Sequence, residues 1–162
     1  MKRFAMSKAM ATITAIYCSS ERKARECAVI LGDHRSLTFT EVRELGEIDR
    51  SATGYLPPDQ LEVVIDEFYS RPLDSVYGRE RAADAQTRIV CAVQRIAKED
   101  RSPGDIALVS HGGVGCLLVA HLVAAPISRV FQQISPYGGC YFSIEGCART
   151  LFEGWRCFED TC

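Results

Sequence analysis

His111 is followed by two glycines, Gly112 and Gly113, and comes directly after the apolar run IALVS at residues 106–110. The run predicts a central parallel strand that is covered on both faces, and the glycines would let the backbone come close to a ligand. The helix expected next would offer free N–H groups and partial positive charge, which favour an anion. His111 could therefore contact a phosphate oxygen, or it could be a structural histidine at a tight turn. Spacing alone leaves both readings open.

Apolar periodicity and turn residues predict alternating strands and helices around this motif. Strands are expected at 13–20, within 36–45, at 106–110, and at 140–146 and 149–159; helices are expected at 21–31, 59–72, 79–99 and 114–125. This alternation predicts an α/β protein, a three-layer α/β/α sandwich with a mostly parallel sheet. Ligands of such sheets bind beyond the carboxyl ends of the strands. The loops after 13–20 and 106–110 are therefore the candidate site.

Length and composition indicate one globular domain over residues 1–162, incomplete at its N-terminus for the reason given below. Hydrophobic residues make up 47% of the chain and charged residues 25%, and the net charge is −2. No window is strongly basic, so we expect neither a nucleic acid nor a membrane as a partner. The run at 106–127 is long enough to span a bilayer, but its serine, histidines and glycines would be costly there.

The chain has eight cysteines, and none of them forms a C-x-x-C pair. A structural zinc site is therefore not expected, and no metal or other cofactor is predicted. Several cysteines lie in apolar runs, where a free thiol behaves as a small hydrophobic side chain. This pattern favours reduced thiols in a cytoplasmic protein over a disulfide-rich secreted module, and thiol titration would separate the two.

Four segments resemble the motifs of the histidine phosphatase (phosphoglycerate mutase-like) superfamily, in the same order and over about residues 13–145. The segment ALVSHGGVG is similar to the second histidine motif of the superfamily. IYCSSERKARECA resembles IYSSPLxRAxxTA, and GRERAADAQTRI resembles the helix start GESxxDxxxRV. ELGEIDRSATG stands where the superfamily has its acidic loop LREIDFGxWEG, although the WEG feature is absent.

The resemblance implies a role for each matching residue. His111 would contact the phosphoryl group and stabilise charge in the transition state, with Gly112 beside it. Glu47 would donate a proton to the leaving oxygen, and Asp49 is its rival for that role. Lys23 stands where the superfamily has its second arginine, and lysine cannot grip a phosphate with two parallel hydrogen bonds. The implied ligand is a phosphorylated small molecule or phosphate, and the oligomeric state is open.

The superfamily's nucleophile is another histidine, in an Arg-His-Gly motif at the end of a first strand, and no Arg-His-Gly occurs in the chain. That strand would lie in the middle of the sheet, beside the strand at 106–110. The resemblance thus predicts an incomplete phosphatase that is inactive or weakly active. The alternative is a non-catalytic remnant that binds an anion or a partner. Of the other histidines, His34 is expected in an exposed loop and His121 in the core or at its boundary, while Tyr137 is a weak candidate for a substrate contact.

Overall fold

The fold was analysed in a computed structural model that describes residues 1–135 and 138–161. In these residues the α-helices are α1 (Lys2–Ala5), α2 (Arg22–Arg35), α3 (Pro58–Ser70), α4 (Ala82–Glu99) and α5 (Gly112–Leu122). The strands are β1 (Ile13–Cys18), β2 (Phe39–Glu41), β3 (Asp105–Val109), β4 (Cys140–Glu145) and β5 (Thr150–Cys157). The predicted alternation of strands and helices is confirmed, with boundaries that move by a few residues.

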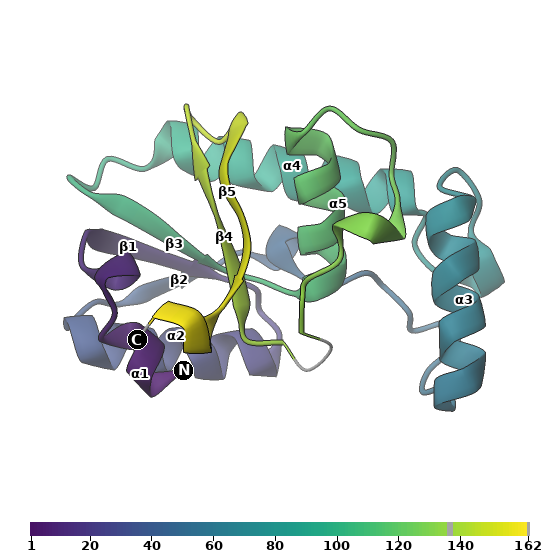
Figure 1. The fold of residues 1–162 in the computed structure, drawn as a ribbon, viewed down its shortest axis with the longest axis horizontal. Helices are drawn as coiled ribbons and strands as arrows, with labels where there is room; N and C mark the ends of the chain where they lie inside the picture. Colours follow the sequence, from purple (N-terminus) through teal and green to yellow (C-terminus); the bar gives the residue numbers. More distant parts are fainter. Residues whose placement is uncertain (136–137, 162) are drawn as a thin grey trace.

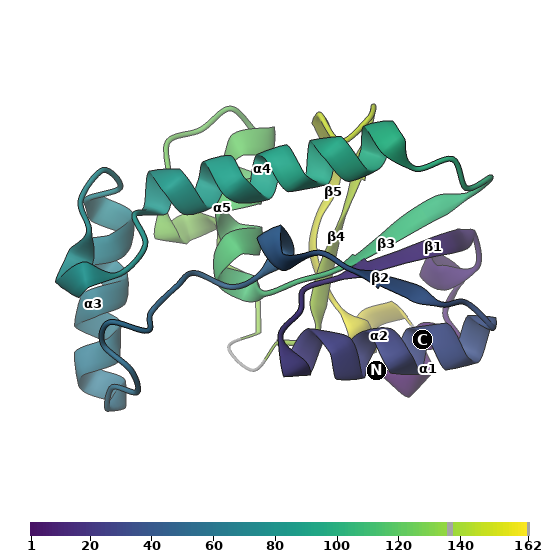
Figure 2. The same ribbon diagram turned by 180° about the vertical axis from the view of Figure 1, so that it is seen from behind.

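Three parallel strands form the main sheet, in the order β2-β1-β3. Helix α2 covers one face and α4 covers the other, so the predicted α/β arrangement with helices on both faces is confirmed (Figure 2). The strand β1 is central, whereas β3 pairs with β1 alone among the described residues. All five residues of β3 keep some exposure, so the prediction of a central, fully covered strand at 106–110 is wrong.

The C-terminal strands β4 and β5 form a separate antiparallel hairpin. The hairpin crosses the strands of the main sheet at a steep angle (Figure 1). Phe4 of α1 stacks on Phe158, with ring centroids 4.2 Å apart, which fixes the N-terminal turn against the end of the hairpin.

Alternation along β1 sends neighbouring side chains to opposite faces of the sheet. Ile16 and Cys18 pack with Leu31 of α2, whereas Tyr17 packs on the side of α4 with Ile89. Apolar side chains on one face of α4 fill this second core, as the 3.6-residue period predicts. Burial on both faces of the sheet thus holds the C-terminal ends of β1 and β3 next to each other.

Helix α3 stands away from the sheet, at the far end of the molecule from β2 and β3 (Figure 1). Its inner face is anchored by Phe68, which is 4% exposed. Arg129, in the segment after α5, forms ion pairs with Glu62 and Asp66 of α3. No helix among the described residues is both long and apolar enough to cross a membrane.

Candidate active site

The parallel register of β1 and β3 places their C-terminal ends side by side. Cys18 is opposite Val109, and the N–H of Ser19 donates to the carbonyl of Val109 at 2.9 Å. The residues that follow β1 and β3 therefore lie next to each other beyond the C-terminal ends of the strands. There, Nε2 of His111 lies 2.9 Å from Oγ of Ser19. The His111 side chain is 11% exposed, so its ring lies at the boundary of the interior rather than in open solvent.

Glu21 is the residue before α2, and its side chain faces His111. Its Oε1 accepts a hydrogen bond from the N–H of Glu47 at 2.7 Å and lies 3.5 Å from Nε2 of His111. The sequence analysis gave Glu21 no role, because it counted Glu21 only as the first residue of the helix expected at 21–31. Ser19 does accept a hydrogen bond, from the N–H of Glu21 at 3.1 Å, but α2 begins only at Arg22. The acidic residue at the start of a predicted helix was the available signal.

The carboxylate of Glu47 lies on the N-terminus of α5. It accepts hydrogen bonds from the N–H groups of Gly113 at 3.1 Å, Val114 at 3.0 Å and Ile48 at 3.1 Å. A helix N-terminus attracts negative charge, and here a side chain of the same chain supplies it. The first N–H groups of this helix were expected to be free for a phosphate. In the structure, those of Gly113 and Val114 are already used.

The glycines after His111 provide space for other side chains. A Cβ atom on Gly112 would lie 2.9 Å from Nε2 of Gln133, and one on Gly113 would lie 2.6 Å from Oε1 of Glu47. Both distances are too short for any real side chain. Glycine therefore allows Gln133 and Glu47 to pack directly on the helix backbone. The sequence reading assigned this space to a ligand. In the structure it is taken by these two side chains.

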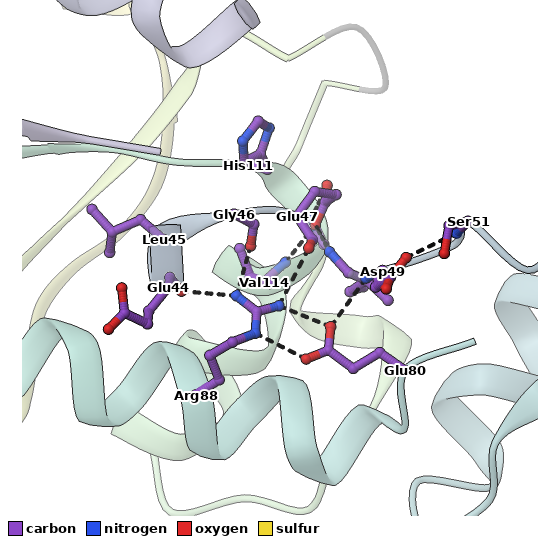
Figure 3. Close-up of polar contacts among 12 residues, drawn as sticks. Glu44, Leu45, Gly46, Glu47, Asp49, Ser51, Glu80, Arg88, His111 and Val114 are labelled. Carbon is purple, nitrogen blue, oxygen red and sulfur yellow. Dashed lines mark hydrogen bonds and ion pairs between the residues drawn. The ribbon is translucent and has the colours of Figure 1, made fainter. Parts of the chain in front are cut away.

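Arg88 of α4 holds the acidic loop from below (Figure 3). Its Nη1 donates to the carbonyls of Glu44 and Gly46 at 2.8 and 2.9 Å, and its Nη2 donates to the carbonyl of Glu47 at 3.2 Å. The carboxylate of Glu80 completes the set, with contacts of 2.8 and 2.9 Å to Arg88, and raises the pKa of the guanidinium. Glu80 and Arg88 align with the glutamate and the arginine of the quoted helix-start pattern, yet the sequence analysis gave them no role.

Asp49 is directed away from the helix that Glu47 caps. Its carboxylate accepts a hydrogen bond from the N–H of Ser51 at 2.9 Å, which lowers the pKa of Asp49. Its own N–H donates to Glu80 at 3.0 Å (Figure 3). The carboxylate of Asp49 thus binds its own loop, whereas that of Glu47 binds the start of α5. The choice between Glu47 and Asp49 as the acid stays a prediction.

The remaining predicted residues lie farther from this edge. Lys23 is exposed in the first turn of α2, and no hydrogen bond or ion pair joins it to His111 among the described residues. His34 is in the last turn of α2 rather than in a loop, and His121, expected at the core, is exposed in the last turn of α5. Tyr137 lies outside the described residues. The contact of Lys23 with a phosphate stays a prediction.

The arrangement brings an imidazole, a hydroxyl and two carboxylates together at the ends of two parallel strands. Such a set can bind a polar ligand and exchange protons with it. In the described part of the chain, no group of three or more histidine, cysteine or acidic side chains is placed to hold a metal ion.

Comparisons with known proteins indicate the family and the fold. The family model described as the histidine phosphatase superfamily (branch 1) matches residues 1–149. A search of curated proteins found no match. Among solved structures, YhfR of Bacillus stearothermophilus is similar over 94% of this chain and 77% of its own, with a TM-score of 0.70 and 24% identity.

Two mycobacterial structures are also similar. The glucosyl-3-phosphoglycerate phosphatase in complex with inorganic phosphate has a TM-score of 0.68 and 20% identity, over 96% of this chain and 80% of its own. Mycobacterial hydrolase 2 has a TM-score of 0.65 and 21% identity over 78% of this chain. The chain spans 60% of the length of hydrolase 2 and 61% of that of the related hydrolase 1. The match of the family model over most of the chain establishes that this protein belongs to the histidine phosphatase superfamily.

Proposed function

We propose that the chain carries the acid and second-histidine half of a phosphomonoester hydrolase site, and that on its own it does not turn over phosphomonoesters. The observation that supports this most is the single imidazole at the site. His121 lies at the other end of α5, about ten residues and therefore about 15 Å from His111. His34 lies about 13 residues along α2 from Glu21, or about 20 Å. Neither can act as a nucleophile beside His111.

In this proposal each polar group has a separate task. Glu47 would protonate the leaving oxygen, as its match to the acidic-loop motif implies, and its side chain lies at the start of α5, directly after His111. His111 would stabilise charge on the phosphoryl oxygens, and Ser19 would orient its ring through the contact at Nε2. A nucleophile must then come from a group outside this half-site, because a covalent step needs a second reactive side chain.

The edge of β3 is where such a group would enter. Among the described residues β3 pairs only with β1, so its other edge carries N–H and C=O groups without a strand partner. A strand that paired there would end next to His111, because parallel strands end at the same side of a sheet. We propose that a strand bearing the nucleophilic histidine occupies this edge in a complete site.

The charges at the half-site lead us to expect that this chain alone binds phosphate only weakly. Glu21 lies 3.5 Å from His111 and is hydrogen-bonded to Glu47, and no hydrogen bond or ion pair among the described residues joins Lys23 to either acid. Like charges a few ångströms apart repel at a partly buried site. A phosphate dianion would therefore need a further cation near His111. The arginine of the superfamily's Arg-His-Gly motif, which does not occur in this chain, would supply it.

The decisive experiment is hydrolysis of p-nitrophenyl phosphate by the purified chain and by its His111→Ala variant. We expect no release of p-nitrophenol above the buffer rate for either protein. The His121→Ala variant serves as a matched control, because it removes an imidazole from the same helix but not from the site. Turnover by the unmodified chain that His111→Ala abolishes and His121→Ala preserves would reject the proposal.

The alternative is a non-catalytic protein that uses the half-site to bind an anion or a partner. The edge of β3 that has no strand partner among the described residues favours it. Titration with inorganic phosphate, followed by the NMR signal of the His111 imidazole, tests this alternative. A saturable shift without any turnover favours binding over catalysis. If the signal does not move at about 50 mM phosphate, the anion-binding version is wrong.

A further inference from the structure

Two cysteine side chains face each other at the base of the C-terminal hairpin. Cys140 is the first residue of β4 and Cys157 is the last residue of β5, and the register of the hairpin sets them directly opposite each other. Their Sγ atoms lie 3.5 Å apart, and in the structure both side chains are thiols. The half-site at His111 uses neither of them.

The backbone at this position suits a bond between the two sulfurs. The N–H of Phe158 donates to the carbonyl of Gly139 at 2.7 Å, so the residues just outside the two cysteines form a hydrogen-bonded pair. Hydrogen-bonded and non-hydrogen-bonded pairs alternate along an antiparallel ladder, so Cys140 and Cys157 form a non-hydrogen-bonded pair. The Cα atoms of such a pair are about 4.5 Å apart, within the range of about 4.4–6.8 Å that a disulfide spans.

The side chains need little movement to form that bond. The sulfurs must approach by about 1.5 Å to reach the length of a disulfide, which is about 2.05 Å. A rotation about the Cα–Cβ bonds supplies such a shift, because the two Cβ atoms already lie on the same face of the hairpin.

Aromatic packing holds the two cysteines in this position. Each is followed in the chain by an aromatic residue, Tyr141 or Phe158. Both rings pack on Phe4 of α1, with centroids 5.0 and 4.2 Å from its ring. Phe4 is 6% exposed and belongs to the core. A shared buried neighbour therefore keeps the start of β4 and the end of β5 together before any bond forms.

The pair also differs from the other cysteines in its exposure. Cys18 and Cys116 are buried in two separate cores, where a small oxidant does not reach them. Cys91 is exposed on α4. Cys140 and Cys157 are half-buried, so part of their surface meets solvent while each thiol has the other within reach.

We propose that Cys140 and Cys157 form a reversible dithiol–disulfide site, which closes the base of the β4–β5 hairpin when a peroxide oxidises it. The inference is independent of the proposed function, because it uses no residue of the half-site. Closing the loop between the two cysteines restricts the unfolded chain. The oxidised protein should therefore unfold at a higher temperature than the reduced protein.

The oxidation has two steps. In the first, the thiolate of one cysteine attacks hydrogen peroxide, the O–O bond breaks, and the products are a sulfenic acid and water. In the second, the sulfur of the other thiol attacks the sulfenic sulfur, the S–S bond forms, the S–O bond breaks, and a second water leaves. The two thiols thus give two electrons and two protons to the peroxide. A small dithiol reverses the reaction by thiol–disulfide exchange.

The test is oxidation of the full chain by a small molar excess of hydrogen peroxide, then digestion without reduction and mass spectrometry. Cleavage after arginine and glutamate separates Cys140 and Cys157 from the other C-terminal cysteines, in the peptides 130–145 and 157–159. We expect these two peptides, joined by a disulfide, as the main product, and we expect dithiothreitol to separate them. If another linkage predominates, or if both cysteines stay thiols, the proposal is wrong.

Variants connect the bond with its effect on stability. In Cys140→Ser and in Cys157→Ser, peroxide should no longer raise the temperature of unfolding, because each variant lacks one partner. Cys91→Ser is the matched control, since it removes an exposed thiol outside the hairpin and should behave like the unmodified chain. A rise that persists in both hairpin variants would overturn the proposal. If a hairpin variant does not fold, the peptide map of the unmodified chain still decides.

Discussion

Arg88 and Arg79 lie on one segment of the chain, and both are largely buried, yet their surroundings differ completely. Arg88 donates to three backbone carbonyls and to both oxygens of Glu80. Arg79 donates to Thr53 alone and leaves Nη2 without a partner. A buried cation with a full set of partners positions its neighbours, whereas one without partners lowers the stability of the fold unless a ligand joins it. The comparison therefore separates an arginine that positions a loop from one whose buried charge has no counter-charge among the described residues.

The largest effect is expected from Arg88→Met. This change removes three hydrogen bonds to the acidic loop and leaves Glu80 without its counter-charge, so we expect the free energy of unfolding to fall by about 3 kcal/mol. Urea unfolding measures this loss. The comparison fails if Arg88→Met costs no more stability than Arg79→Met.

The next largest effect is expected from Gly113→Ala. The added methyl group would lie 2.6 Å from Oε1 of Glu47 and 2.7 Å from Cδ1 of Ile48, so the acidic loop must move away from α5. Overpacking of this kind costs about 1–3 kcal/mol. Gly154→Ala is the matched control, because no atom lies within 4 Å of the added methyl there. Equal unfolding midpoints for the two variants would show that the contact between Glu47 and the helix is loose.

Arg79→Met is expected to change stability in the opposite direction. Without a ligand, the variant replaces an uncompensated buried charge by an apolar side chain of similar length, which should raise the free energy of unfolding by about 1 kcal/mol. Thermal unfolding in a buffer free of phosphate and carboxylates measures the difference. A clear loss of stability would mean that Arg79 has a structural role like that of Arg88.

The smallest effect concerns pH and Asp49. Its pKa is lowered in the folded state from the ordinary 3.8. The stabilisation of the fold by the charged carboxylate of Asp49 is therefore complete above pH 3.8, and it is lost as the pH falls through the pKa of the folded state. The difference in urea midpoint between the unmodified chain and Asp49→Asn should be constant near neutral pH and shrink below about pH 4. Asp33→Asn is the control, because it shows how the urea midpoint changes when a carboxylate is removed elsewhere on the chain. A difference that grows on acidification would contradict the assignment.

Much of the fold was predictable from local patterns. The apolar runs at β1 and β3 and the stripe of α4 gave elements of the right kind, because burial on one or two faces imposes a period on the sequence. The extent of α2 was not predictable, because Glu21 precedes the helix without a capping hydrogen bond from its side chain to the helix. The position of β3 at the sheet edge was also missed, since a short apolar run does not report how many strands flank it.

The residues of the site, like the elements of the fold, were predictable only in part. His111 and Glu47 could be singled out because each belongs to a segment that resembles a motif of the superfamily, and their catalytic roles stay predictions. Glu21, Ser19 and Arg88 could not be assigned a place in it, because their contacts join segments that are far apart in the chain. The glycines after His111 were assigned to a ligand because a sequence does not show which side chains occupy the space they leave.

By itself, the sequence determined the class of fold, the order of its elements and the kind of residue at the strand ends, because these depend on local periodicity and residue chemistry. Only the tertiary structure decided that Glu47 neutralises the start of α5 and that Arg88 is fully paired while Arg79 is not. Both arginines lie on one polar segment, and only packing against distant loops gives Arg88 a full set of acceptors and leaves Arg79 with Thr53 as its one acceptor among the described residues.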